Sequence, residues 1–147
     1  MTTLSSDIQS QLTAQGIELP SWAFGNSGTR FKVFQTPGTP RDPFEKIADA
    51  AEVNRVTALA PSVALHIPWD KVDDFSALRR YAEDLGVQLG TINSNTFQDD
   101  DYKFGALTHE DAGVRRKAID HHIACIDVMD ATGSRDLKVW LAEGSNY

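Results

Sequence analysis

One short stretch of the sequence, His66-Ile67-Pro68-Trp69-Asp70-Lys71, holds an imidazole, an indole, a carboxylate and an ammonium group. The apolar run before Pro68 predicts a buried strand. Because side chains alternate across a strand, His66 faces the side opposite to Leu65. An indole packs against the C–H groups of a sugar, and an imidazole and charges bond its hydroxyls, so the stretch fits a polyhydroxylated ligand. A hydrogen-bonded core histidine beside a structural tryptophan is the alternative explanation.

Trp140 repeats this arrangement on a later predicted strand. The run 137–142 carries Lys138, Trp140 and Ala142 on one face. Tryptophan also fills protein cores. Two tryptophans and a histidine at the ends of different strands are nevertheless typical of a barrel pocket, because such pockets take residues from several strand ends.

Several other polar groups favour structural explanations. The segment 93–97 follows a predicted strand and fits a tight turn. We expect Asp99, Asp100 and Asp101 to form a solvated acidic patch rather than a cation site. His121 and His122 are neighbours on a predicted helix, where they cannot chelate one ion, and we expect them at its surface. The single cysteine, Cys125, excludes an intrachain disulfide, and we expect a buried thiol in a reducing compartment.

A repeated order of strand, loop and helix positions these residues. We expect strands at 21–24, 63–67, 87–93 and 137–142, and helices at about 4–15, 42–58, 74–85 and 108–132. Thr108 and Asp111 have capping-box spacing at the start of the last helix. Its expected core side comprises Val114, Ala118, Ile119, Ile123, Ile126 and Met129.

Loop lengths help to choose between two architectures for this pattern. The connections that follow strands are long, whereas those that enter strands are short, as in a barrel whose mouth is built from the loops after the strands. The predicted fold class is therefore α/β, the N-terminal half of a (β/α)8 TIM barrel with about four parallel strands. An open doubly wound sheet is the alternative.

Length and charge limit the possible functions. A complete barrel needs about 250 residues, so we expect the chain to form one partial barrel domain over its residues 1–147. The chain has 14 Lys+Arg against 21 Asp+Glu, a net charge of −7, which argues against a nucleic-acid partner. We see neither the apolar stretch of a secretory signal nor a membrane span, and we expect a cytoplasmic protein without a membrane partner.

Six ordered blocks carry a resemblance to a known family: residues 20–22, 28–31, 66–71, 93–97, 102–105 and 140–147. Taken together, they make the chain, from about residue 20 to its end, resemble the bacterial L-rhamnose isomerases and related broad-specificity sugar isomerases. The resemblance implies a (β/α)8 barrel, usually homotetrameric, that interconverts aldoses and ketoses such as L-rhamnose and L-rhamnulose. It also implies a divalent metal cofactor, commonly Mn²⁺.

The resemblance further implies roles for individual residues. By this resemblance, the substrate-binding residues are Trp22, His66, Trp69 and Trp140, together with Phe31, which in the family reaches into a neighbouring subunit's pocket. The family's metal ligands and acid/base groups correspond to positions beyond Tyr147. We therefore expect neither catalytic nor metal-binding residues in this chain, and no turnover by the chain alone.

Two other functions stay open. A metal-dependent ketose epimerase has a similar barrel, whereas an endonuclease barrel would need the basic surface that this sequence lacks. A non-catalytic sugar-binding or interaction module, folded as an open sheet, is the other possibility. A monosaccharide is the expected small-molecule partner of the isomerase.

Overall fold

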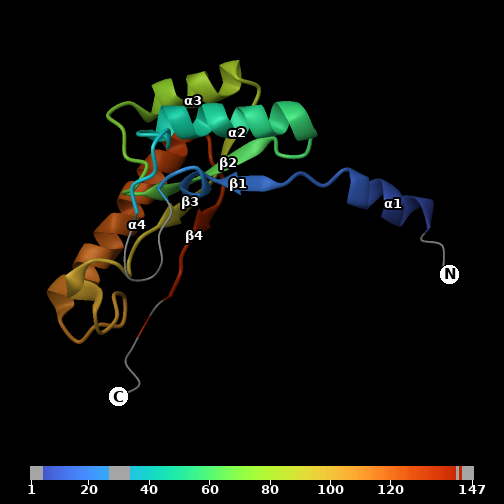
Figure 1. Ribbon diagram of the computed structural model, residues 1–147. Helices are drawn as coiled ribbons and strands as arrows, with labels where there is room; N and C mark the ends of the chain where they lie inside the picture. Colours follow the sequence, from blue (N-terminus) through green and yellow to red (C-terminus); the bar gives the residue numbers. More distant parts are fainter. Residues whose placement is uncertain (1–4, 27–33, 142, 144–147) are drawn as a thin grey trace.

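The computed structural model describes residues 5–26, 34–141 and 143, and its elements alternate between strands and helices (Figure 1). One parallel sheet contains β1 (Glu18–Pro20), β2 (Ser62–Ile67), β3 (Gln88–Ser94) and β4 (Leu137–Lys138). The helices are α1 (Ser6–Thr13), α2 (Pro43–Thr57), α3 (Phe75–Asp84) and α4 (Ala112–Thr132), with short 3-10 helices η1 (Ser21–Ala23) and η2 (Asp100–Tyr102).

The order of the strands decides between the two α/β architectures. Each strand pairs with the strand before it, in the order β1-β2-β3-β4, without the reversal of a doubly wound sheet. Helix α2 packs on α3, and α3 packs on α4, so the three helices lie side by side along one face of the sheet. This arrangement is an arc of a (β/α)8 barrel, which confirms the predicted half-barrel fold.

The core lies between the sheet and these three helices. Val63 and Leu65 of β2, Ile92 of β3, Ile47 of α2 and Leu78 of α3 are all completely buried there. Burial of such side chains is the main favourable term in folding. It fixes which side of each strand faces the helices and therefore which side faces the barrel axis.

Caps set the ends of the helices. The Asp42 side chain accepts a hydrogen bond from the Glu45 amide at the start of α2. Asp111 caps α4 in the same way, and Gly133 ends it at a φ of 74°, a conformation that favours glycine. The predicted role of Thr108 in this cap is wrong, because its hydroxyl donates to Glu143 instead.

Two predicted strands have different bounds in the structure. The segment predicted as a strand at 21–24 contains η1, and β1 precedes it and ends at Pro20, where proline offers no amide hydrogen for a further ladder bond. Strand β4 is shorter than predicted, because its pairing with β3 ends at the pair Asn93–Lys138, one residue before β3 itself ends.

Helix α4 packs through only part of the predicted face: Ala118 and Met129 pack inward as predicted, but the three isoleucines do not. Ile119, Ile123 and Ile126 are 43%, 48% and 53% exposed, whereas Ala118 and Cys125 are buried. Cys125 and Val128 belong to the main core, and Ala118 belongs to a second cluster with Tyr102 and Ala106. The isoleucines therefore lie on the outer side of the helix. Like the other helices in the described part of the chain, α4 is not long and apolar enough to cross a membrane.

The histidines of α4 are also placed differently from the prediction. His121 and His122 are half-buried rather than at the surface. The Asn95 amide donates to Nε2 of His121 at 3.0 Å, and Ser94 Oγ lies 3.1 Å from Nε2 of His122. Both histidines therefore fasten α4 to the carboxyl end of β3.

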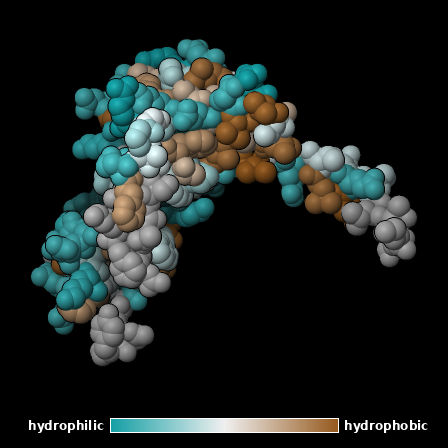
Figure 2. Space-filling model, in the orientation of Figure 1, coloured by the Kyte–Doolittle hydropathy of each residue, from teal (hydrophilic) through white to brown (hydrophobic). Residues whose placement is uncertain are grey.

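Helix α1 stands apart from the sheet (Figure 1) and has no buried residue. Its Ile8 and Leu12 are exposed. Figure 2 shows further apolar surface over the end of α2 and the start of β1, where Ile17, Val56 and Leu59 are exposed.

A pair of isoleucine substitutions tests this core. Ile47→Ala in α2 is expected to lower the free energy of unfolding by about 2–5 kcal/mol, because it leaves a cavity in a packed core. Ile123→Ala, also in the middle of a helix, is expected to change it by about 1 kcal/mol or less, because Ile123 is half exposed. Urea denaturation of both variants measures the difference, and equal losses would contradict this packing.

Candidate functional site

A pocket of about 290 Å³ opens at the carboxyl ends of the strands. It is lined by Trp22, His66, Trp69, Asn93, Ser94, Phe97, Lys138 and Trp140. All three tryptophans of the chain are among them. The structure thus brings together four of the five residues predicted to bind substrate, and their role in binding stays a prediction. The fifth, Phe31, lies outside the described residues.

The aromatic side chains of the pocket touch one another in a chain. The rings of His66 and Trp69 stack at 3.7 Å with an interplanar angle of 14°. Trp22 meets both edge-on, at 5.4 Å from His66 and 6.5 Å from Trp69. Phe97 connects this group to Trp140, whose ring centre is 4.8 Å away. The pocket therefore has a nearly continuous aromatic wall.

The indoles remain open to a ligand. Trp22, Trp69 and Trp140 are 38%, 42% and 63% exposed, whereas His66 is only 6% exposed. A ligand that covered these rings would remove apolar surface from water, at about 25 cal/mol per Å².

His66 is a neutral hydrogen-bonding group at the base of this wall. Burial lowers the pKa of its imidazole to about 4, and the nearby Asp70 charge only partly opposes this effect. A neutral imidazole has one donor and one acceptor nitrogen. Its Nδ1 is buried and has no hydrogen-bond partner among the residues that the structure describes. Such a ring suits the hydroxyl of a ligand, which can both donate and accept.

Polar contacts behind the wall hold it in place. The indole N–H of Trp69 donates to Gln98 Oε1 at 2.9 Å, and the Asn95 side chain donates to the same oxygen at 3.0 Å. The Asn93 side chain donates through Nδ2 to the Leu65 carbonyl at 3.0 Å. Because its N–H is already satisfied, Trp69 can offer the pocket its ring face.

Four lining residues were not predicted as site residues: Asn93, Ser94, Phe97 and Lys138. The sequence analysis assigned Asn93, Ser94 and Phe97 to a tight turn. The strand register explains why Asn93 and Lys138 belong to the site, since His66 pairs with Asn93, and Asn93 pairs with Lys138. His66, Asn93 and Lys138 thus lie side by side on neighbouring strands. The alternation that placed Trp140 and Lys138 on the same face could have identified Lys138 from the sequence.

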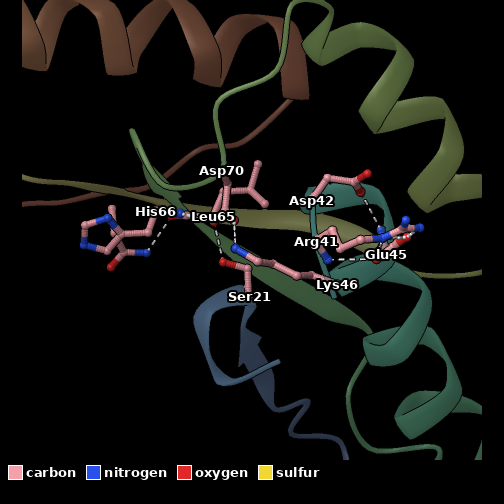
Figure 3. A network of polar contacts seen from close by, with 9 residues as sticks. Ser21, Arg41, Asp42, Glu45, Lys46, Leu65, His66 and Asp70 are labelled. Carbon is pink, nitrogen blue, oxygen red and sulfur yellow. Dashed lines mark hydrogen bonds and ion pairs between the residues drawn. The ribbon is translucent and has the colours of Figure 1, made fainter. Parts of the chain in front are cut away.

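The prediction that Asp70 and Lys71 bond ligand hydroxyls is wrong. Asp70 is completely buried, and its carboxylate accepts hydrogen bonds from Ser21, Lys46 and the His66 amide (Figure 3). Its oxygens are thus occupied within the protein. Lys71 is exposed and does not line the pocket.

The described residues do not form a metal site. Nowhere in the described part of the chain do three or more His, Cys, Asp or Glu side chains gather as metal ligands would. Within the acidic patch, Asp99 and Asp101 pair with Lys117 at 2.8 and 2.7 Å. No reaction step through a metal follows from these residues.

The fold and the site thus define a partial (β/α)8 barrel with an aromatic pocket at the carboxyl ends of its strands. No protein-family model matches the chain. The chain is 43% identical over 145 residues to two proteins named "Probable sugar isomerase", one from Rhizobium meliloti and one from Mesorhizobium japonicum. The matches cover 95% of this chain but 34% of each relative, so the chain spans about a third of their length. They support the broader expectation, a relationship to sugar isomerases.

The low pKa of His66 leads to a prediction. NMR titration is expected to show this imidazole still neutral at pH 5, with a midpoint near 4. Because the unfolded chain, at about 6.5, binds a proton more readily, the free energy of unfolding decreases as the pH falls from 6.5 towards 4. His66→Gln identifies the signal among the four histidines and removes this share of the pH dependence. A midpoint near 6.5 would contradict the burial of the ring.

Proposed function

We propose that this chain forms the sugar-binding part of an aldose–ketose isomerase that converts L-rhamnose to L-rhamnulose. The observation that carries the proposal is the pocket, where three tryptophans and a neutral histidine from different strand ends meet. Its volume of about 290 Å³ is at the lower end of the range for small-molecule sites, about 300–1,000 Å³. That size suits one monosaccharide better than an oligosaccharide.

The aromatic side chains and His66 each contact a different part of the sugar in this proposal. The indoles of Trp22, Trp69 and Trp140 cover the C–H faces of the sugar and exclude water from them. His66 exchanges a hydrogen bond with a hydroxyl and, being neutral, brings no charge into the pocket. L-rhamnose is a deoxy sugar with a methyl group, and the aromatic contact between Phe97 and Trp140 offers this group an apolar place.

The remaining chemistry is assigned to residues outside this chain. A divalent metal, commonly Mn²⁺ in the family that the chain resembles, would polarise the carbonyl and the neighbouring hydroxyl of the open sugar. Its ligands and the acid/base groups are proposed to come from a longer polypeptide, of the length of the two relatives. A homotetramer in which Phe31 completes a neighbour's pocket, and a cytoplasmic location, complete the proposal.

An isomerisation assay with L-rhamnose and added Mn²⁺ tests this function. We expect no turnover from residues 1–147 alone. We expect turnover when the chain is joined to the part of the Rhizobium meliloti relative that the match leaves uncovered, with that relative as the positive control. Robust activity of the chain alone would contradict the proposal that the metal ligands and the acid/base groups lie outside this chain. Ketose C3 epimerisation by the joined protein, without isomerisation, would instead support the epimerase.

Trp69 allows a sharper prediction in the joined protein. Trp69→Ala is expected to raise KM for L-rhamnose roughly 2- to 13-fold, because it removes an aromatic contact of about 0.5–1.5 kcal/mol. Trp69→Phe, which keeps a ring in the same place, is the matched control and is expected to retain most of the affinity. Steady-state kinetics measure both, and an unchanged KM in Trp69→Ala would show that this indole does not contact the sugar.

A further inference from the structure

The buried carboxylate of Asp70 lies behind the pocket, where it joins elements that are distant in the sequence. Its Oδ2 accepts hydrogen bonds from the Ser21 hydroxyl and from the His66 amide, the latter at 2.7 Å. Its Oδ1 accepts one from Lys46 Nζ of α2 at 2.6 Å. The Asp70 amide in turn donates to the His66 carbonyl at 2.8 Å, which closes the turn after β2. Figure 3 shows these contacts converging on one side chain.

Two of the three partners of this carboxylate, Ser21 and His66, adjoin or belong to the aromatic residues of the pocket, and the third, Lys46, balances its charge. Ser21 immediately precedes Trp22, and Asp70 itself immediately follows Trp69. The carboxylate also accepts a hydrogen bond from the backbone amide of His66, and the His66 ring stacks on Trp69. A single group therefore links the backbones that carry Trp22, His66 and Trp69, although Ser21 and Asp70 are 49 positions apart.

Stability alone does not account for this arrangement. Asp70 is completely buried, and the Lys46 side chain is only 12% exposed. Removing both charges from water costs free energy, so a well-packed apolar pair at such a position is often equally or more stabilising. What an apolar pair cannot supply is a directional bond to the Ser21 hydroxyl and to the His66 amide.

We propose that Asp70, with its charge balanced by Lys46, is a positioning residue that sets the place of Trp22 relative to the His66–Trp69 stack. The proposal rests on the proposed function only for the identity of the ligand that uses this geometry. Asp70 does not contact the ligand. It holds η1 and the end of β2 in the relative positions at which the two indoles are 6.5 Å apart.

Two variants weaken this link to different degrees. Ser21→Ala removes only the bond to η1 and leaves Asp70, Lys46 and β2 unchanged. Asp70→Asn keeps the size of the side chain but replaces one acceptor oxygen with an amide donor, which must then face either Lys46 or the Ser21 and His66 donors. The control is Thr132→Val, which also removes a buried hydroxyl, one that bonds the Val128 carbonyl and Ser134 Oγ away from the pocket.

Near-UV circular dichroism of the chain is the deciding measurement, because closely spaced indoles give a signal that depends on their mutual orientation. All three tryptophans line the pocket, so the tryptophan band reports on it alone. We expect Ser21→Ala and Asp70→Asn to lose much of this band with an unchanged far-UV spectrum, and Thr132→Val to keep it. Urea denaturation of each variant shows how much stability is lost in parallel.

A near-UV band in Ser21→Ala equal to that of the unsubstituted chain, with a loss of stability like that of Thr132→Val, would overturn the proposal. If Asp70→Asn does not fold, Ser21→Ala alone decides. Addition of L-rhamnose to the unsubstituted chain separates the two proposals. A band that responds to Ser21→Ala but never to sugar would count against the proposed ligand and still support positioning by Asp70.

Discussion

The parallel pairing of each strand with the one before it is the constraint on which the site depends. Right-handed crossovers place α2, α3 and α4 on one face of the sheet and bring the carboxyl ends of all strands to one edge. As a result, His66, Asn93 and Lys138 share a rung of the sheet, and Trp22 and Trp140 follow its outer strands. Residues spread over most of the chain thereby enclose one pocket.

Two carboxylates join backbone segments that are distant in the sequence. Asp70 connects the ends of β1 and β2 from within the protein. Glu143 accepts hydrogen bonds from the amides of residues 106–108 and from the Thr108 hydroxyl. Burial would raise the pKa of Glu143, but these bonds outweigh it and lower the pKa below its ordinary value. Neither carboxylate lines the pocket, and each holds backbone segments together through its hydrogen bonds.

Local patterns in the sequence were sufficient for much of the fold. Proline and aspartate at the start of α2, the apolar run of β2 and the glycine at the end of α4 each act over a few residues, and the elements that they predict are present. The inward direction of His66 followed from alternation along β2. The role of Asp70 did not follow, because its partners Ser21 and Lys46 become neighbours only when the sheet and α2 assemble. On α4 the inward position of Ala118 was predicted, but the isoleucines were also assigned to the core because they look more apolar than the smaller side chains that pack there.

The central claim is that the aromatic pocket binds a monosaccharide, and intrinsic fluorescence tests it directly because every tryptophan of the chain lines the pocket. The measurement is a titration of the chain with L-rhamnose, with glycerol as a control for nonspecific effects of hydroxyl compounds. A saturable change in tryptophan emission with L-rhamnose, weak in affinity and absent with glycerol, is the result that this account predicts. Emission that never saturates, or that responds to both compounds alike, would contradict it.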